Sequence, residues 1–262
     1  MLRLIDGHAH LDEVEGLEAA MIRAGKAGVI AVVAVSSNDR SIKRTLEISG
    51  QYGDTVVYPA LGIHPWDLQA DREDTTLDLI EKNIHKAVGI GEIGLDYWLK
   101  DVRKKPDKKD LQKRTYRKLL GLSKRYHKPA LIHARGSWED CLALALEVGV
   151  EKAVFHWYSG PLPILKKILN AGYFISATPA AQYSKNHQAA ISEAPLENLL
   201  LETDTPVSYQ GKPSEPAHVL RTLEAVAEIK GIAKEQVAEI TTKNALAFFD
   251  LQSMGNPRLP AR

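Results

Sequence analysis

The chain has 262 residues, of which 44% are hydrophobic, and this composition suits one large α/β domain with a sizeable core. Its net charge of +1 provides no overall field that would select nucleic acid or a membrane, and no apolar run is long enough to cross a bilayer. A single cysteine, Cys141, excludes an intrachain disulfide, and the missing apolar amino-terminal segment excludes a signal peptide, so we expect a cytoplasmic protein.

Short apolar runs alternate with amphipathic segments along the chain. The runs predict strands at 2–5, 29–35, 56–61, 87–90, 129–132, 153–155, 173–176 and 199–201. Helical spacing of apolar residues predicts helices at 15–26, 39–52, 75–86, 108–126, 137–148, 162–171, 185–193, 217–230 and 234–249. Eight strand-then-helix units predict a parallel sheet closed into a (β/α)8 TIM-type barrel, with a doubly wound open sheet as the alternative. We expect one domain over residues 1–250 and a tail over 251–262.

Histidines and carboxylates recur directly after the predicted strands. They are His8 and His10 after the first strand, Glu92 after the fourth, His133 after the fifth, His156 after the sixth and Asp204 after the eighth. The carboxyl ends of barrel strands meet at one rim, so we expect these six side chains to converge there. Imidazole and carboxylate ligands without thiolate suit divalent cations such as Mg²⁺, Mn²⁺ or Zn²⁺. The set therefore predicts a site for two metal ions, bridged by Glu92.

Each of these residues also has a structural interpretation when it is taken alone. His133 and His156 suit ordinary strand ends, Glu92 suits the cap of a turn, and Asp204 suits the start of a turn before Pro206. The repeated placement of all six at one end of the predicted strands favours the metal site.

Other polar residues near the predicted rim have two interpretations each. His64 ends the third strand, where it either donates a hydrogen bond to a substrate or leaving-group oxygen or packs under the loop of Pro65. The guanidinium fork of Arg135 suits a phosphate, with a rim salt bridge as the alternative. Asp6 and Asp96 are candidates to orient ligand imidazoles. The remaining histidines are interpreted as surface residues: His85, His127, His187 and His218.

Six short motifs follow one another along nearly the whole chain: DGHAHL (6–11), GIHPW (62–66), GEIGLDY (91–97), LIHAR (131–135), HWYSG (156–160) and LLLETDTP (199–206). In this order they resemble the TatD family of metal-dependent deoxyribonucleases. The resemblance implies a barrel with metal ligands at His8, His10, Glu92, His133, His156 and Asp204. It also implies nuclease activity on DNA, commonly 3′-to-5′ exonucleolytic.

Two further features favour a nucleic-acid substrate. The stretch 100–118 contains ten Lys or Arg and three Asp, and it can follow a phosphate backbone or form a solvated helix face. All four tryptophans, Trp66, Trp98, Trp138 and Trp157, lie just past predicted strands, where they can stack on unpaired bases or roof the barrel core.

The sequence as a whole predicts a two-metal phosphodiesterase that acts on single-stranded ends of DNA. We assign catalytic roles to Asp204 as the base, to Glu92 as the bridge and to His64, and substrate contacts to Arg135, Trp66, Trp98 and Trp157. The alternative is an amidohydrolase-type enzyme on the same scaffold, acting on an amide, lactone or aminoacyl ester. Neither a membrane nor an obligate protein partner is inferred.

Overall fold

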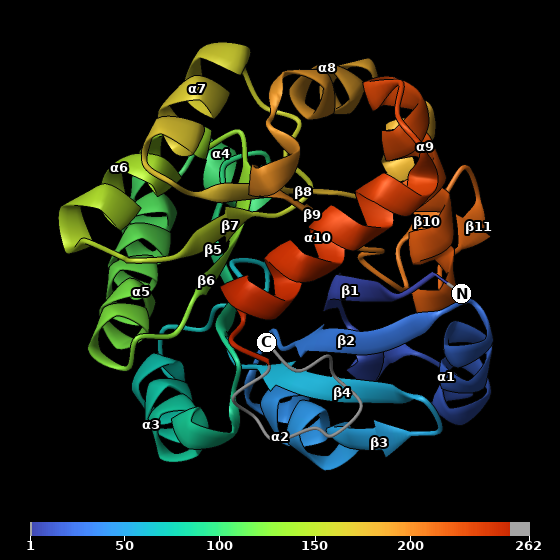
Figure 1. Cartoon of the computed structure of the whole chain (residues 1–262). Helices are drawn as coiled ribbons and strands as arrows, with labels where there is room; N and C mark the ends of the chain where they lie inside the picture. The colour runs from blue at the N-terminus through green and yellow to red at the C-terminus, as the bar shows by residue number, and fades with distance from the viewer. Residues whose placement is uncertain (1, 252–262) are drawn as a thin grey trace.

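The computed structural model describes residues 2–251 (Figure 1). The strands are β1 (Leu4–Ala9), β2 (Val29–Val35), β3 (Gly50–Tyr52), β4 (Thr55–Ala60), β5 (Ile90–Asp96), β6 (Ala130–Arg135), β7 (Ala153–Phe155), β8 (Phe174–Ala177), β9 (Leu199–Leu201), β10 (Ser208–Tyr209) and β11 (Lys212–Pro213). The α-helices are α1 (Leu17–Lys26), α2 (Asp39–Ile48), α3 (Glu73–Asn83), α4 (Lys100–Arg103), α5 (Pro106–Arg125), α6 (Trp138–Val148), α7 (Leu162–Asn170), α8 (Lys185–Glu193), α9 (Val219–Lys230) and α10 (Lys234–Phe248). Short 3₁₀ helices are η1 (Leu11–Glu13), η2 (Ile84–Lys86), η3 (Pro179–Gln182), η4 (Leu196–Asn198) and η5 (Pro216–His218).

Eight parallel strands form a closed barrel within residues 2–251. Strands β1, β2 and β4 pair in one sheet, and β5 to β9 pair in sequence order in a second sheet. The two sheets join at two seams, where Ala60 pairs with Gly89 and Ala9 pairs with Thr205. At the second seam the backbone N–H of His10 donates to the carbonyl of Thr205 at 2.7 Å. The predicted barrel is confirmed, and the alternative of an open sheet is wrong.

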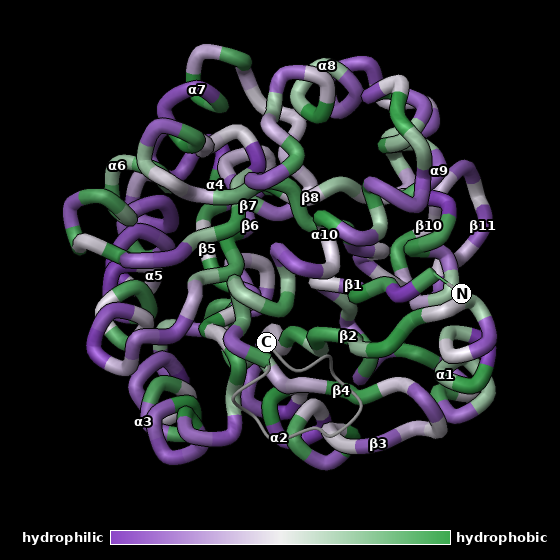
Figure 2. The backbone as a smooth tube through the Cα atoms, in the orientation of Figure 1, coloured by the Kyte–Doolittle hydropathy of each residue, from purple (hydrophilic) through white to green (hydrophobic). Residues whose placement is uncertain are grey.

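Apolar side chains form two layers around the barrel wall. One layer lies between the strands and the surrounding helices, and the other fills the inside of the barrel. The inner layer includes Ile5, Ala31, Val33, Tyr58, Leu131, Val154 and Leu200. Strand β2 is coloured hydrophobic along its length in Figure 2, whereas the outer helices alternate between hydrophilic and hydrophobic residues. This difference is typical of parallel strands covered on both faces.

Helix α10 closes the amino-terminal end of the barrel and crosses the middle of the view in Figure 1. Its Phe248, together with the following Phe249, packs against the inner layer. The hydroxyl of Thr242 donates to the carbonyl of Arg3, just before β1, at 2.6 Å. The Lys152 ammonium, just before β7, donates to a carbonyl at the end of the same helix. Access to the barrel is therefore from the opposite, carboxyl end of the strands.

The element boundaries differ from the predictions where polar residues interrupt the apolar pattern. Strand β5 begins at Ile90 rather than at residue 87 and continues to Asp96, so that Glu92 lies inside the strand rather than after it. Strands β1 and β6 likewise extend past the predicted ends. The helix predicted over 39–52 ends at Ile48, because 50–52 turn back as β3 and pair antiparallel with β4. The β10–β11 hairpin was not predicted.

Two predictions concern the extent of the domain. The single domain over residues 1–250 stays a prediction. The predicted tail, apart from Leu251, lies outside the described residues, as does Met1. None of the helices in residues 2–251 combines the length and apolar character needed to span a bilayer.

Candidate metal centre

The six predicted ligands converge at the carboxyl end of the barrel. His8, Glu92 and His133 lie within β1, β5 and β6, and His10 and His156 follow β1 and β7 directly. Asp204 comes three residues after β9. All of them are buried except His10, whose side chain is 14% exposed. His64, four residues after the end of β4, is also buried and joins the group.

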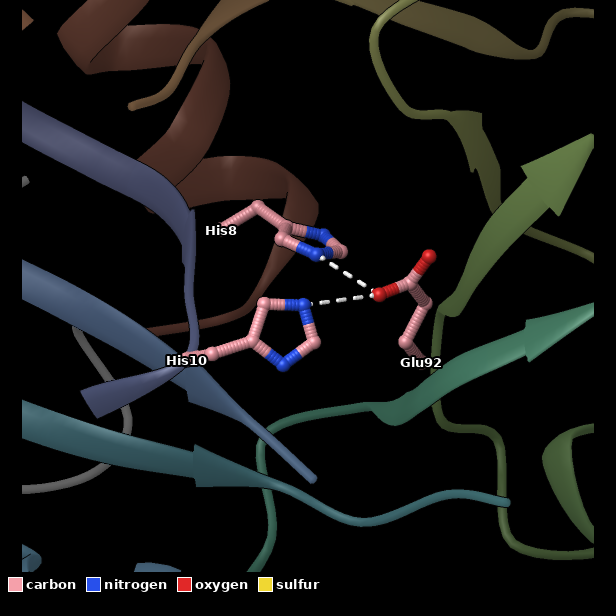
Figure 3. A group of neighbouring side chains, drawn as sticks. All are labelled: His8, His10 and Glu92. Carbon is pink, nitrogen blue, oxygen red and sulfur yellow. Dashed lines mark hydrogen bonds and ion pairs between the residues drawn. The ribbon is translucent and has the colours of Figure 1, made fainter. Parts of the chain in front are cut away.

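One carboxylate oxygen of Glu92 faces the two histidines of the first strand and its end. Figure 3 shows the imidazoles of His8 and His10 directed at the same oxygen of Glu92. The distances from Oε2 are 3.1 Å to His8 Nε2 and 3.0 Å to His10 Nε2. Asp204 Oδ1 lies 3.5 Å from His8 Nε2 and 3.6 Å from His10 Nε2. These four residues form a first half-site.

The other oxygen of Glu92 faces a separate set of imidazoles. Its Oε1 lies 2.8 Å from His133 Nδ1, 2.9 Å from His156 Nε2 and 3.2 Å from His64 Nε2. His133 Nδ1 and His156 Nε2 are themselves 3.4 Å apart. These residues form a second half-site, and Glu92 belongs to both.

The donor atoms fit divalent cations by distance and by chemistry. Ligand atoms about 2.0–2.2 Å from one ion are separated from each other by about 3 Å, which is the spacing observed in both half-sites. Asp204 Oδ1 is buried and has no hydrogen-bond partner among the described residues, as is expected of an oxygen that needs a cation. The residues therefore fit one ion on each side of the Glu92 carboxylate.

The imidazoles around Glu92 keep its carboxylate ionised. Burial acts to raise the pKa of Glu92, but the imidazoles of His64, His156 and His8 outweigh it and hold the pKa well below its usual value. Burial lowers the pKa of both His8 and His64 to about 4, so both imidazoles are neutral at neutral pH. Burial acts to lower the pKa of His10, but the hydrogen bond to Glu92 raises it to about 9. An ionised carboxylate thus lies among nitrogens that compete for protons.

Two glycines allow the strands to carry these ligands so close together. A Cβ atom on Gly62 would lie 2.5 Å from the carbonyl oxygen of Glu92, far inside van der Waals contact. Gly94 has a φ of +147°, and a Cβ there would lie 1.9 Å from the carbonyl oxygen of His133. A side chain at Gly62 would push the segment after β4 away from Glu92, and one at Gly94 would push β5 away from His133.

Two further carboxylates, Asp96 and Asp6, lie next to the candidate ligands. Asp96 Oδ2 lies 3.1 Å from His133 Nε2, so the predicted orienting role of Asp96 has a contact to support it. Asp6 instead accepts from the backbone N–H and the hydroxyl of Thr203, at 2.9 and 2.6 Å, and contacts no ligand imidazole in the described residues. Asp6 Oδ1 also accepts from the backbone N–H of His8 at 3.4 Å, so Asp6 contacts the backbone of a candidate ligand, and an orienting role toward an imidazole stays a prediction.

Glu202 was not singled out in the sequence. Its Oε1 accepts from the backbone N–H of Trp157 at 3.0 Å and lies 3.3 Å from His156 Nδ1. Its side chain is buried, and one of its oxygens lies within 4.8 Å of ring nitrogens of His8 and His156. Its position two residues before Asp204, on the same strand end, was the signal that could have identified it.

The surface placement predicted for His187 is wrong. This histidine of α8 is fully buried. Its Nδ1 donates to the carbonyl of Tyr158 at 2.7 Å, and its Nε2 accepts from the backbone N–H of Thr178 at 3.1 Å. His187 therefore ties the loop after β7 to the loop after β8. The other three predicted surface histidines are exposed or half-buried.

A cavity of about 690 Å³ lies over the candidate metal centre. Its floor includes His10, His64, Glu92, His133, His156 and Asp204, and its walls include Arg135 and all four tryptophans. Trp66 and Trp98 are 55% and 60% exposed, and Trp98 stacks edge to face on Trp138 with ring centres 5.8 Å apart. The residues predicted to contact substrate thus line one cavity with five of the six predicted ligands.

The basic stretch 100–118 divides into two parts. In its later turns, Lys113, Arg117 and Lys118 form ion pairs with acidic residues of neighbouring helices. In the part of the chain that the structure describes, Arg103, Lys104 and Lys105 take part in no ion pair, and all three are exposed. These three follow Trp98 closely in the chain, whereas none of the stretch lines the cavity itself.

Comparisons with known proteins point to one family. The model of the family "TatD related DNase" matches residues 5–250. The human "Deoxyribonuclease TATDN3" is 31% identical, over 94% of this chain and 94% of that protein. The "Uncharacterized metal-dependent hydrolase YabD" of Bacillus subtilis is 32% identical, over 94% and 98%. The crystal structure of YJJV, a TatD homolog from Escherichia coli, superposes with a TM-score of 0.84 and 26% identity, and covers 95% of this chain and 98% of that one.

Proposed function

Because the chain belongs to the TatD-related DNase family, we propose that it is a deoxyribonuclease that uses two divalent cations. Family membership makes it a metal-dependent hydrolase acting on ester bonds. The finer proposal concerns the substrate, which is an unpaired end of DNA cleaved in the 3′-to-5′ direction, and the ions, which are Mg²⁺, Mn²⁺ or Zn²⁺.

One observation supports this proposal more than any other. The two oxygens of Glu92 face different ligand sets, with His8 and His10 on one side and His133 and His156 on the other. A carboxylate with this arrangement suits a bridge between two ions about 3.5–4 Å apart, as in enzymes that cleave phosphodiesters by in-line displacement. The cavity above it is large enough for a nucleotide and is lined by tryptophans and an arginine.

The side chains divide the chemical work as follows. Bound cations supply Lewis-acid polarisation of the phosphate and lower the pKa of an attacking water. Asp204, with a buried oxygen that lacks a hydrogen-bond partner in the described residues, orients this water and accepts its proton. His64 assists the leaving oxygen, since its Nε2 reaches the floor of the cavity beside Glu92. Arg135 forms an ion pair with Asp96 through its Nε, and its two terminal nitrogens are then available to bind the phosphate.

The rim of the cavity suits unpaired bases. Trp66, Trp98 and Trp157 line it, and an exposed indole face stacks on any base without regard to sequence. A duplex keeps its bases stacked on one another, so stacking on these rings requires a frayed or single-stranded end. Arg103, Lys104 and Lys105 then contact the phosphates of the strand as it leaves the cavity.

Cleavage of labelled oligonucleotides tests the proposal. The metal-loaded enzyme is incubated with one single strand labelled at its 5′ end and the same strand labelled at its 3′ end. We expect the 5′ label to appear in a ladder that shortens with time and the 3′ label to appear at once in mononucleotides. The opposite pattern would reverse the direction, and cleavage of acyl substrates without cleavage of DNA would favour the amidohydrolase alternative.

A further inference from the structure

A single buried carboxylate contacts both the candidate metal centre and the cavity rim. This is Asp96, the last residue of β5, which is completely shielded from solvent. Its Oδ2 accepts a hydrogen bond from Trp66 Nε1 at 2.6 Å and lies 3.1 Å from His133 Nε2. Its Oδ1 accepts from the backbone N–H of Trp98 at 2.9 Å. One side chain thus joins a candidate ligand to two tryptophans of the cavity.

The contact with Asp96 determines which nitrogen of His133 can bind a cation. A carboxylate accepts hydrogen bonds, so His133 Nε2 carries the proton that is directed at Asp96. His133 Nδ1 then keeps its lone pair, and this is the atom that lies 2.8 Å from Glu92 Oε1 in the second half-site. A ligating histidine usually donates its other ring N–H to a carboxylate, a backbone carbonyl or a water, and this contact fixes the tautomer and the orientation of the ring.

The same Oδ2 atom also determines where Trp66 lies. The indole edge is hydrogen-bonded to Asp96, while its face lies 5.0 Å from the Arg135 guanidinium. Arg135 Nε is itself 2.8 Å from Asp96 Oδ2. Trp66 is nevertheless 55% exposed, so it is held at its edge and remains open to a ligand on the rest of its surface.

The backbone behind this group is fixed by Gln112 of α5. The backbone N–H of Asp96 donates to Gln112 Oε1 at 3.1 Å. Gln112 Nε2 donates to the carbonyl of Pro65, the residue before Trp66, at 3.3 Å. Because Gln112 is buried, the end of β5 and the loop that bears Trp66 cannot shift independently.

We infer that Asp96 is a positioning residue that couples cation binding at His133 to the position of Trp66 on the cavity rim. A ligand that moves or immobilises the Trp66 indole changes the hydrogen bonds on Oδ2 and, through them, the His133 ring. By linkage, a cation bound at His133 changes the affinity of the rim for that ligand by the same factor. The identity of the ligand as DNA rests on the proposed function, whereas the coupling of Trp66 to the metal centre does not.

Three variants separate this role from a general structural one. Asp96→Asn keeps the volume but loses the charge. Trp66→Phe removes the indole N–H that reaches Asp96 while keeping an aromatic ring. Trp98→Phe is the matched control, because Trp98 contacts Asp96 through its backbone N–H, which phenylalanine retains.

Calorimetric titration of each metal-free variant with Mn²⁺ measures the coupling without DNA or turnover. We expect Asp96→Asn to lower the affinity for one of the two Mn²⁺ ions about 10- to 100-fold. This is the usual effect of losing a carboxylate that is hydrogen-bonded to a ligating histidine. Trp66→Phe should lower the affinity for the same ion about 5-fold or more, and Trp98→Phe should leave this affinity unchanged. Nitrogen-15 shifts of His133 should show loss of the single Nε2–H tautomer in Asp96→Asn.

Several outcomes would overturn the inference. Wild-type Mn²⁺ affinity in Asp96→Asn would show that His133 does not depend on this carboxylate. Equal effects of Trp66→Phe and Trp98→Phe would show that the indole N–H transmits nothing. If Asp96→Asn fails to fold in thermal unfolding, the comparison of the two tryptophan variants decides alone. Binding of a single-stranded oligonucleotide to the wild type is measured separately, and its absence would reject DNA as the ligand while leaving the coupling intact.

Discussion

Salt dependence of binding to a single-stranded oligonucleotide is expected to distinguish the two parts of the basic stretch. The change is the simultaneous replacement of Arg103, Lys104 and Lys105 by glutamine. These side chains are exposed and, in the described residues, take part in no ion pair, so each is available to a phosphate. Each phosphate contact on a single strand contributes about 0.7 to the slope of log K against log salt, so the loss of three should reduce the slope by about 2.

The measurement is fluorescence anisotropy of a labelled single strand over a range of salt concentrations, in chelator so that no cleavage occurs. The matched control replaces Lys113, Arg117 and Lys118 by glutamine, which removes the same charge from the later turns. Their partners, Asp140, Glu147 and Asp74, lie at 2.8–3.0 Å, so these cations are already neutralised and the slope should change little. An unchanged slope in the first variant, or equal reductions in both, would refute the assignment of the phosphate path to residues 103–105.

The remaining predictions concern the metal centre and the single cysteine. Glu92→Gln should retain the barrel, as measured by circular dichroism. Metal analysis should find fewer than two bound ions in this variant, because the bridging charge is lost. Two tightly bound ions would show that Glu92 does not bridge them. Asp204→Asn should reduce the chemical step by ~10²–10⁴-fold in single-turnover assays if Asp204 is the base, whereas a loss explained entirely by missing metal would make it a ligand only. Burial raises the pKa of Cys141 to about 12, so the thiol stays protonated at pH 8 and should react with a disulfide reagent only after unfolding; rapid reaction of the native protein would contradict its buried position.

The sequence predicted the barrel because its buried strands are nearly continuous apolar runs, which carry a strong signal. The same signal misplaced strand ends where function requires polar residues. Glu92 and His133 interrupt the apolar pattern, so β5 and β6 appeared to stop before them although the backbone continues to Asp96 and Arg135. The hairpin strands β3, β10 and β11 have two or three residues each, too few to show a period of two.

The candidate ligands were predictable because each lies at or near a strand end, and parallel strands of a barrel end at one rim. Contacts between residues far apart in sequence were not predictable. The charge of +7 in residues 100–118 gave no indication that Lys113 and Arg117 are paired with acidic residues of α6. Likewise, nothing in the sequence patterns connects Trp66 with Asp96.

The burial of His187 did have a signal in the sequence. His187, Ala190 and Ile191 are spaced by three and four residues along α8, and all three are buried. This spacing places them on one face of the helix. A histidine in that pattern indicates an internal hydrogen-bonding role rather than a solvated one.

The seam between β1 and the segment after β9 has a consequence for protein synthesis. His8 leaves the ribosome long before Asp204, whose backbone N–H donates to the His8 carbonyl at 3.0 Å. The lid formed by α10 arrives later still. A nascent chain therefore carries the histidines of the first strand without the partners that complete a half-site. The candidate metal centre is therefore completed only after translation has passed the last barrel strand.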